Sequence, residues 1–248
     1  MTEEEVSDDA VAARDLLVGT LGTITEQGAA VGAAGRIASS LNQVSAAPEE
    51  ISSTATDGAL GTVTAFADAG SCANADGINQ ADASTRSECE AVGGNVWTDD
   101  KFDTQAVDGF ANSASNLLIA AKGQFVEARR RRRLAEVEEG DGEGANVTDT
   151  SAEEFAAAAA RGGAIRNIVG AVAVGTTGDK VAGEARTEIA TDAFALETSR
   201  EEAADMQGKT LGAGVSVPGG FLPEGFEGTV DSQVTAWQGD DNPFFFAG

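Results

Sequence analysis

The chain contains no histidine and no tyrosine, and it has only two cysteines and four prolines. Without histidine it lacks the commonest general base, the usual activator of a nucleophilic serine or cysteine, and the commonest zinc ligand. Serine and cysteine triads of the usual kind are therefore excluded. Adjacent carboxylates such as Glu49-Glu50 are so frequent that solvation explains them better than catalysis. We expect no enzyme, no catalytic residue, no cofactor and no metal site.

Basic residues and long apolar runs are scarce too. The chain has 16 Lys and Arg against 41 Asp and Glu, which gives a net charge of −25. Because phosphate groups are met by Lys and Arg, this charge disfavours nucleic acid and anionic membrane surfaces as partners. No apolar run approaches the roughly 20 residues that a membrane span needs. The acidic start, Met1-Thr2-Glu3-Glu4-Glu5, does not resemble a signal peptide and by itself favours a soluble cytoplasmic protein.

Two other features favour an extracellular location. Cys72 and Cys89 enclose a segment rich in Gly, Asn, Asp and Ser. A disulfide that closes such a loop contributes roughly 3 kcal/mol to stability. Asn146 begins a glycosylation sequon, Asn146-Val147-Thr148, within a polar segment. The alternative is a pair of free thiols and an unused sequon.

Apolar residues at helical spacing predict five helices in the first two thirds of the chain. They cover residues 7–25, 29–44, a segment that follows Pro48, 104–138 and 152–174, the last with a break at Gly162-Gly163. The predicted apolar stripes are Val11, Leu16, Leu17, Leu21 and Ile24 in the first helix; Val31, Ile37, Leu41 and Val44 in the second; Ile51, Ala55, Ala59, Val63 and Phe66 in the third; and Val107, Phe110, Ala114, Leu117, Leu118, Ala121, Phe125 and Ala128 in the fourth.

After Val174 the period changes. A glycine-rich corner follows, and alternating segments at residues 187–198, 214–218 and 229–237 predict strands. The expected fold class is α+β, with an N-terminal antiparallel helical array followed by a partial antiparallel β-sandwich. Residues 1–174 form the helical subdomain, with a cysteine-containing irregular insert at 68–101 and a flexible acidic linker at 139–150. Residues 175–248 form the β-strand region, which we expect to be incomplete.

Five consecutive arginines, here called the arginine run, end the longest predicted helix: Arg129, Arg130, Arg131, Arg132 and Arg133. Such a run can serve nuclear targeting, contact nucleic acid or be cut by a protease that recognises dibasic sites. The plain alternative is a solvated helix end whose cations suit the negative end of the helix dipole. The net charge argues against nucleic acid, so we favour the solvated helix end, with processing second.

Several short motifs follow one another in a characteristic order. The helical pattern from Ile37 to Ile51 precedes Asn116-Leu117-Leu118, a strand from Glu188 to Glu197, Val215-Ser216-Val217-Pro218 and finally Asn242-Pro243-Phe244. This order resembles the REJ (receptor for egg jelly) region and adjoining GAIN-type domain of polycystin-like surface proteins, across residues 30–248. The resemblance implies helices before a GAIN-like β-sandwich. The family's His-Leu-Ser/Thr cleavage site has no counterpart, so no catalytic residue is carried over.

The resemblance implies a non-enzymatic extracellular module of a polycystin-like membrane protein, serving adhesion, ligand sensing or mechanical coupling. Its partner would be a protein or glycan at the cell surface, and its membrane anchor would lie outside this chain. The alternative is a soluble acidic structural or scaffold protein, coat-like, from a high-salt organism. A Cys72–Cys89 bridge would separate the first hypothesis from the second.

Overall fold

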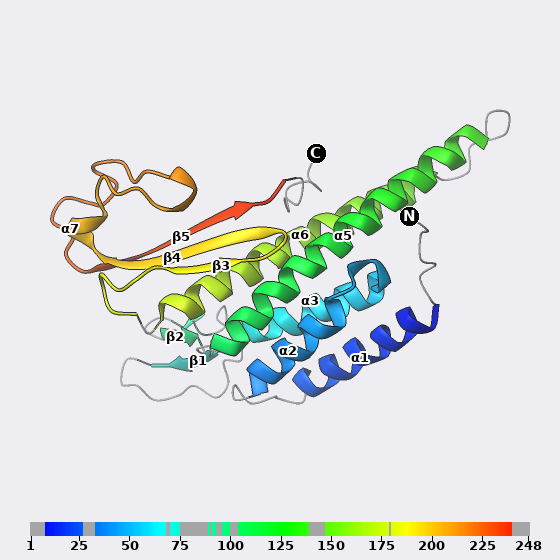
Figure 1. Cartoon of the computed structure of the whole chain (residues 1–248), viewed down its shortest axis with the longest axis horizontal. Coiled ribbons are helices and arrows are strands. Elements are labelled where there is room, and N and C mark those ends of the chain that lie inside the picture. Colours follow the sequence, from blue (N-terminus) through cyan, green and yellow to red (C-terminus); the bar gives the residue numbers. More distant parts are fainter. Residues whose placement is uncertain are drawn as a thin grey trace.

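The computed structural model shows a mixed helical and sheet protein, in which a group of helices packs against a three-stranded antiparallel sheet (Figure 1). This confirms the mixed α and β class. The structure describes residues 8–26, 33–67, 70–74, 89, 91–92, 96–99, 104–138, 147–178 and 180–239. The helical part consists of α1 (Asp8–Glu26), α2 (Ala34–Ser45), the short 3-10 helix η2 (Pro48–Glu50), α3 (Ser53–Ala67), α5 (Thr104–Glu138) and α6 (Val147–Thr177).

The predicted apolar stripes of the second, third and fourth helices form the core. Phe110, Leu117 and Leu118 of α5 are completely or almost completely buried, and Phe66 of α3 packs against Phe110 with 5.5 Å between ring centroids. All predicted stripe residues of these three helices are buried, apart from the half-buried Ala128 and Val31, which lies outside the described residues. Helical periodicity therefore located this part of the core correctly.

The predicted stripe of α1 is wrong in part. Val18 is the buried residue of this helix, while Leu16 is 73% exposed and Leu17 and Ile24 are also exposed. Gly58 of α3 explains the choice of side, since a Cβ atom there would lie 3.1 Å from a methyl group of Val18. The helix has apolar residues on two sides, and periodicity alone does not say which side is covered.

Helix α6 also differs from its prediction. It begins at Val147, within the predicted flexible linker, and it continues through Gly162-Gly163 and past Val174 to Thr177. Residues 139–146 lie outside the described part of the chain. Each glycine costs a helix about 1 kcal/mol relative to alanine. Burial of Ala158 before the break predicted here, and of Ile165 and Ile168 after it, outweighs that cost.

The insert at residues 68–101 is not wholly irregular. Strands β1 (Gly70–Ala73) and β2 (Val96–Asp99) pair in antiparallel fashion, with Cys72 opposite Trp97. Most of the segment between them lies outside the described residues. The prediction missed this pair because its strands are short and glycine-rich segments surround them.

The main sheet has the order β3-β4-β5, formed by β3 (Thr187–Ala190), β4 (Phe194–Glu202) and β5 (Thr229–Trp237). The predicted strand at 187–198 is therefore a hairpin. At its turn the Thr191 hydroxyl donates to the carbonyl of Phe194 at 2.9 Å and accepts the N–H of Phe194 at 3.1 Å. This local bonding by a threonine side chain competes with the strand ladder and reverses the chain.

The predicted strand at 214–218 is wrong. The segment begins at the end of a 3-10 turn, η3 (Gly212–Gly214), and folds back on residues 208–211 around an isolated bridge between Ser216 and Thr210, outside the main sheet. Ala213 and Gly214 have φ values of 52° and 75°, which a strand does not allow. This turn belongs to the segment between β4 and β5, residues 203–228, which includes the short helix α7 (Ala203–Met206) and is called the lobe below.

The sheet lies between α6 and the lobe. Alternation along β4 directs Phe194 and Leu196 to the helical core, where Trp237 of β5 meets Phe194 edge-on at 5.4 Å. The opposite face carries a small separate cluster in which Met206, Leu211 and Val217 of the lobe are buried. Figure 1 shows the lobe at one end of the long axis.

Candidate functional site

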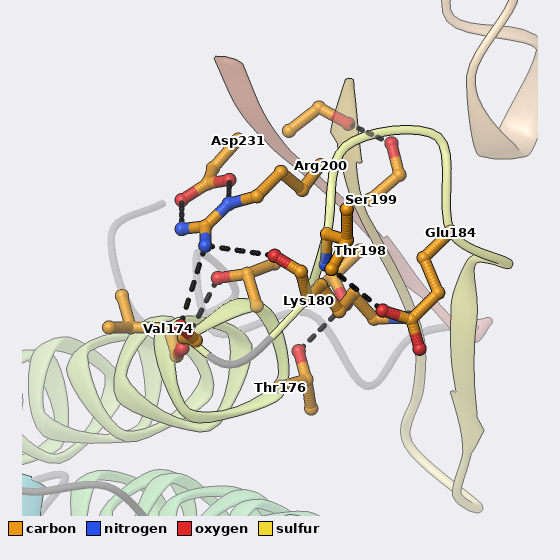
Figure 2. Close-up of polar contacts among 12 residues, drawn as sticks. Val174, Thr176, Lys180, Glu184, Thr198, Ser199, Arg200 and Asp231 are labelled. Atoms are coloured by element: carbon orange, nitrogen blue, oxygen red, sulfur yellow. Dashed lines mark hydrogen bonds and ion pairs between the residues drawn. The ribbon is translucent and has the colours of Figure 1, made fainter. Parts of the chain in front are cut away.

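A polar junction around Arg200 joins the end of α6 to the sheet (Figure 2). The guanidinium donates from Nε and Nη2 to the two carboxylate oxygens of Asp231 on β5, at 2.6 and 2.7 Å. Its Nη1 donates to the carbonyl oxygens of Gly178 and Lys180, just beyond α6, at 3.4 and 3.1 Å. A cation at this position suits the negative end of the helix dipole. All three guanidinium nitrogens are thus used inside the chain.

Neutral contacts complete the same junction. The hydroxyls of Thr176 on α6 and Thr198 on β4 are 2.7 Å apart, and the N–H of Gly183 donates to the carbonyl of Arg200 at 2.9 Å. Gly183 has a φ of 80°, which glycine adopts without strain. The junction is therefore a structural clamp between helix and sheet.

Ion pairs on the other face of the sheet hold the lobe. The Glu197 carboxylate accepts from Arg186 Nη1 at 2.7 Å and from the N–H of Gly212 at 3.0 Å. The buried Glu201 pairs with Lys209 of the lobe. Arg186, just before β3, also donates to the carbonyl of Thr210 in the lobe at 3.1 Å. Together with the contacts of Gly212 and Lys209, this fixes the lobe relative to the sheet.

The helical part is tied together in the same way. Arg161 of α6 forms two hydrogen bonds to the Asp57 carboxylate on α3, at 2.6 and 2.8 Å. These hydrogen bonds and the negative charge of Asp57 raise the pKa of Arg161 above its usual value, although its partial burial acts in the opposite direction. Arg14 of α1 similarly bonds Glu50 of η2. These pairs have structural roles.

The lobe carries a feature of a different kind. Two β-turns follow each other, Pro218-Gly219-Gly220-Phe221 and Pro223-Glu224-Gly225-Phe226, here called the double turn. In each, the phenylalanine N–H donates to the proline carbonyl, at 3.2 Å in the first turn and 3.1 Å in the second. The third residues, Gly220 and Gly225, have φ values of 80° and 78°, as a type II turn requires.

The double turn leaves both phenylalanines in solvent. Phe221 is 61% exposed and Phe226 is 47% exposed. Two exposed acidic residues, Glu224 and Glu227, lie close to Phe226 in the sequence. Two more exposed acidic residues come earlier, Glu202 at the end of β4 and Asp205 in α7. The arrangement offers aromatic faces and carboxylates together, which suits contact with a cationic or mixed apolar and cationic surface.

Of the predicted site residues, the structure describes the side chains of Cys89, Arg129 and Arg130. Cys89 is completely buried, and no cysteine thiol is free among the described residues. The side chain of Cys72 lies outside that part, so the Cys72–Cys89 bridge stays a prediction. Asn146 also lies outside the described residues, and its glycosylation stays a prediction.

The arginine run lies inside α5, which continues to Glu138. Arg129 stacks over the ring of Phe125 at 5.8 Å, and Arg130 is 75% exposed with Glu127 at 3.9 Å. A processing protease would have to unwind the helix at this point, because proteases bind extended chain. Processing of the run therefore stays a prediction that needs local unfolding.

The double turn was not predicted from the sequence. The repeated Pro-x-Gly-Phe pattern was available as a signal, since glycine at the third position of each repeat suits a type II turn. The apolar residues of 214–218 were instead assigned to a strand. What the repeat could not reveal was the exposure of its two phenylalanines.

No known protein family, curated protein or solved structure matches the chain. In the described part, no helix is long and apolar enough to cross a membrane. The same residues include no group of three or more Cys, Asp or Glu placed to hold a metal ion.

Proposed function

We propose that the protein is a non-enzymatic structural protein that assembles through contacts between protein surfaces. The observation that carries the proposal is the double turn, which holds Phe221 and Phe226 in solvent on a lobe fixed to the sheet. Aromatic residues are enriched in protein interfaces, and an exposed apolar patch with a polar rim is typical of an interaction site.

The turns also reduce the entropic cost of binding. Proline fixes φ at one position of each turn, and a hydrogen bond closes the turn before any partner arrives. A contact surface that is ordered in advance loses less conformational entropy when it binds. The lobe therefore has the character of a preformed contact surface.

The rest of the chain suits a rigid support. Ion pairs such as Arg161–Asp57 and Arg200–Asp231 each join two different elements, so these charged groups serve internal contacts. The large net negative charge keeps such a protein in solution. These properties support the soluble acidic structural or scaffold protein considered in the sequence analysis.

The test compares the wild type with the double variant Phe221→Ser and Phe226→Ser by sedimentation velocity over a range of concentrations. A matched control, Leu16→Ser with Leu17→Ser, removes two exposed apolar residues from α1. We expect wild type and control to form assemblies and the double phenylalanine variant to stay monomeric, with similar thermal unfolding midpoints for that variant and the wild type. A wild type that is monomeric throughout would refute the proposal.

A second candidate is the extracellular module of a polycystin-like protein, with the three strands forming part of a GAIN-like sandwich. Helices followed by an antiparallel sheet, together with a buried Cys89 that has no free thiol, favour it. Intact mass of the protein isolated from its source, alkylated with and without reductant, tests this candidate. A Cys72–Cys89 bridge and a glycan at Asn146 are expected. Two thiols that alkylate without reductant would contradict it.

A further inference from the structure

We propose that the double turn binds the arginine run of a second copy of this chain, so that copies join end to end. The inference rests on the proposed function and adds to it the partner surface and the geometry. It brings together two features that the fold keeps far apart, the exposed aromatic and acidic lobe and the basic stretch of α5.

The arginine run lies on a projecting part of the molecule. The last buried residue of α5 with a described side chain is Phe125, and the arginines follow it. Figure 1 shows α5 and the start of α6 extending together beyond the other helices, at the end of the long axis opposite the lobe. This projecting part of α5, residues 126–138, is called the arm below. In this view the arm lies away from the sheet and from α1, α2 and α3, with the start of α6 beside it.

The arginines of the run with described side chains are accessible to a partner. Arg129 is exposed, and the side chain of Arg130 is 75% exposed. A guanidinium forms paired hydrogen bonds with a carboxylate and stacks on an aromatic ring. Arg129 of the arm already stacks in this way on Phe125, the residue just before the arm. The double turn offers the same ring type beside carboxylates.

Charge complementarity identifies the second copy as the occupant. The run contains five of the 16 basic residues in the chain. Only 11 basic residues therefore stand elsewhere in the chain against 41 acidic residues. In the lobe, Lys209 is engaged with Glu201, while Glu224 and Glu227 are exposed beside the two phenylalanines. The basic stretch and the acidic aromatic surface are thus both supplied by the same chain.

The positions of the two surfaces determine the kind of assembly. Because arm and lobe lie at opposite ends of the molecule, one copy cannot bring its own arm to its own lobe (Figure 1). The contact joins two different patches and leaves a free arm at one end and a free lobe at the other. Repetition of such a heterologous contact produces an open chain of copies and not a closed dimer.

The test uses two variants, each of which replaces the residues on one side of the contact with uncharged polar residues. The arm variant replaces all five residues of the run with Gln, and the lobe variant combines Phe226→Ser, Glu224→Gln and Glu227→Gln. Each variant alone should associate at least tenfold more weakly than the wild type. An equimolar mixture should form a 1:1 dimer that does not grow, because one intact arm meets one intact lobe. Sedimentation velocity and native mass spectrometry measure both results.

The outcomes separate the inference from the proposed function. A wild type that never associates refutes the proposed function. Assembly of the wild type that persists in the lobe variant, or a mixture that gives no dimer, overturns the end-to-end contact and leaves assembly through another surface. A further measurement does not depend on whether these variants fold. A photoreactive phenylalanine analogue at position 226 of the otherwise wild-type chain should cross-link to residues 126–138 of a second copy. A cross-link to any other segment also overturns the inference.

Discussion

At the scale of single residues, the contact between α2 and α5 depends on the missing side chain of Gly109. A Cβ atom at this position would lie 2.7 Å from the Cβ of Ala38 and 2.9 Å from its carbonyl carbon. The second of these atoms belongs to the backbone, which cannot move aside as a flexible side chain can. The two helices therefore pack as closely as a glycine allows.

We predict that Gly109→Ala destabilises the protein by about 1–3 kcal/mol, because α2 must shift away from α5. Gly123 of the same helix provides the control, since a Cβ atom there would meet nothing within 4 Å. Gly123→Ala should stabilise by up to about 1 kcal/mol through helix propensity alone. Urea unfolding of the two variants measures the difference. Equal effects of both substitutions would show that α2 is not tightly seated at Gly109.

Residue patterns predicted burial well where only one side of a helix is apolar. Ile37 and Leu41 of α2 are buried as expected because the opposite side of that helix is polar. In α1 the pattern failed, since Leu16 and Val18 lie on different sides and only the contact with Gly58 decides between them. That contact joins residues far apart in the sequence, so no local pattern contains it.

At the scale of elements, Arg200 joins three of them, β4, β5 and the end of α6. Its contacts need the planar, forked guanidinium, because one side chain reaches both the Asp231 carboxylate and two backbone carbonyls. A lysine ammonium carries the same charge on a single nitrogen and cannot reproduce these directions.

Arg200→Lys should therefore destabilise the protein by about 1–2 kcal/mol. This loss is smaller than that expected for fully buried charged hydrogen bonds, because the Arg200 side chain remains about a quarter exposed to solvent. Arg36→Lys on the exposed side of α2 is the matched control and should change stability by less than about 0.5 kcal/mol. Thermal unfolding followed by circular dichroism compares them. If Arg200→Lys behaves like the control, the junction does not hold α6 to the sheet.

The elements that sequence predicted best are the ones with long regular periods. Helix α5 was predicted with the observed limits, 104–138, because its apolar stripe continues over many turns. The hairpin turn at Thr191 was missed because Thr191 and its neighbours continue an alternating pattern, and a side-chain hydrogen bond breaks the strand. The double turn was missed as well, because the predicted strand at 214–218 ends where the double turn begins and no element was predicted for residues 219–226.

At the scale of the whole molecule, the charge opposes the assembly that the arm and the lobe favour. Two copies each carry a net charge of −25 and repel one another when the ionic strength is low. The screening length falls from about 30 Å at 0.01 M salt to about 10 Å at 0.1 M and about 3 Å at 1 M. Intermediate salt therefore screens the two bodies from each other while it leaves contacts of a few ångströms in place.

We predict that the association constant of the wild type passes through a maximum near 0.1–0.2 M salt. Below this range the repulsion between acidic bodies weakens association, and above it the ion pairs between arginines and carboxylates are screened. The arm variant, which lacks those ion pairs, should show no fall at high salt. Sedimentation velocity between 0.01 and 1 M NaCl measures both curves. An association that strengthens steadily up to 1 M would mean that apolar contact alone, through Phe221 and Phe226 or through the exposed side of α1, joins the copies.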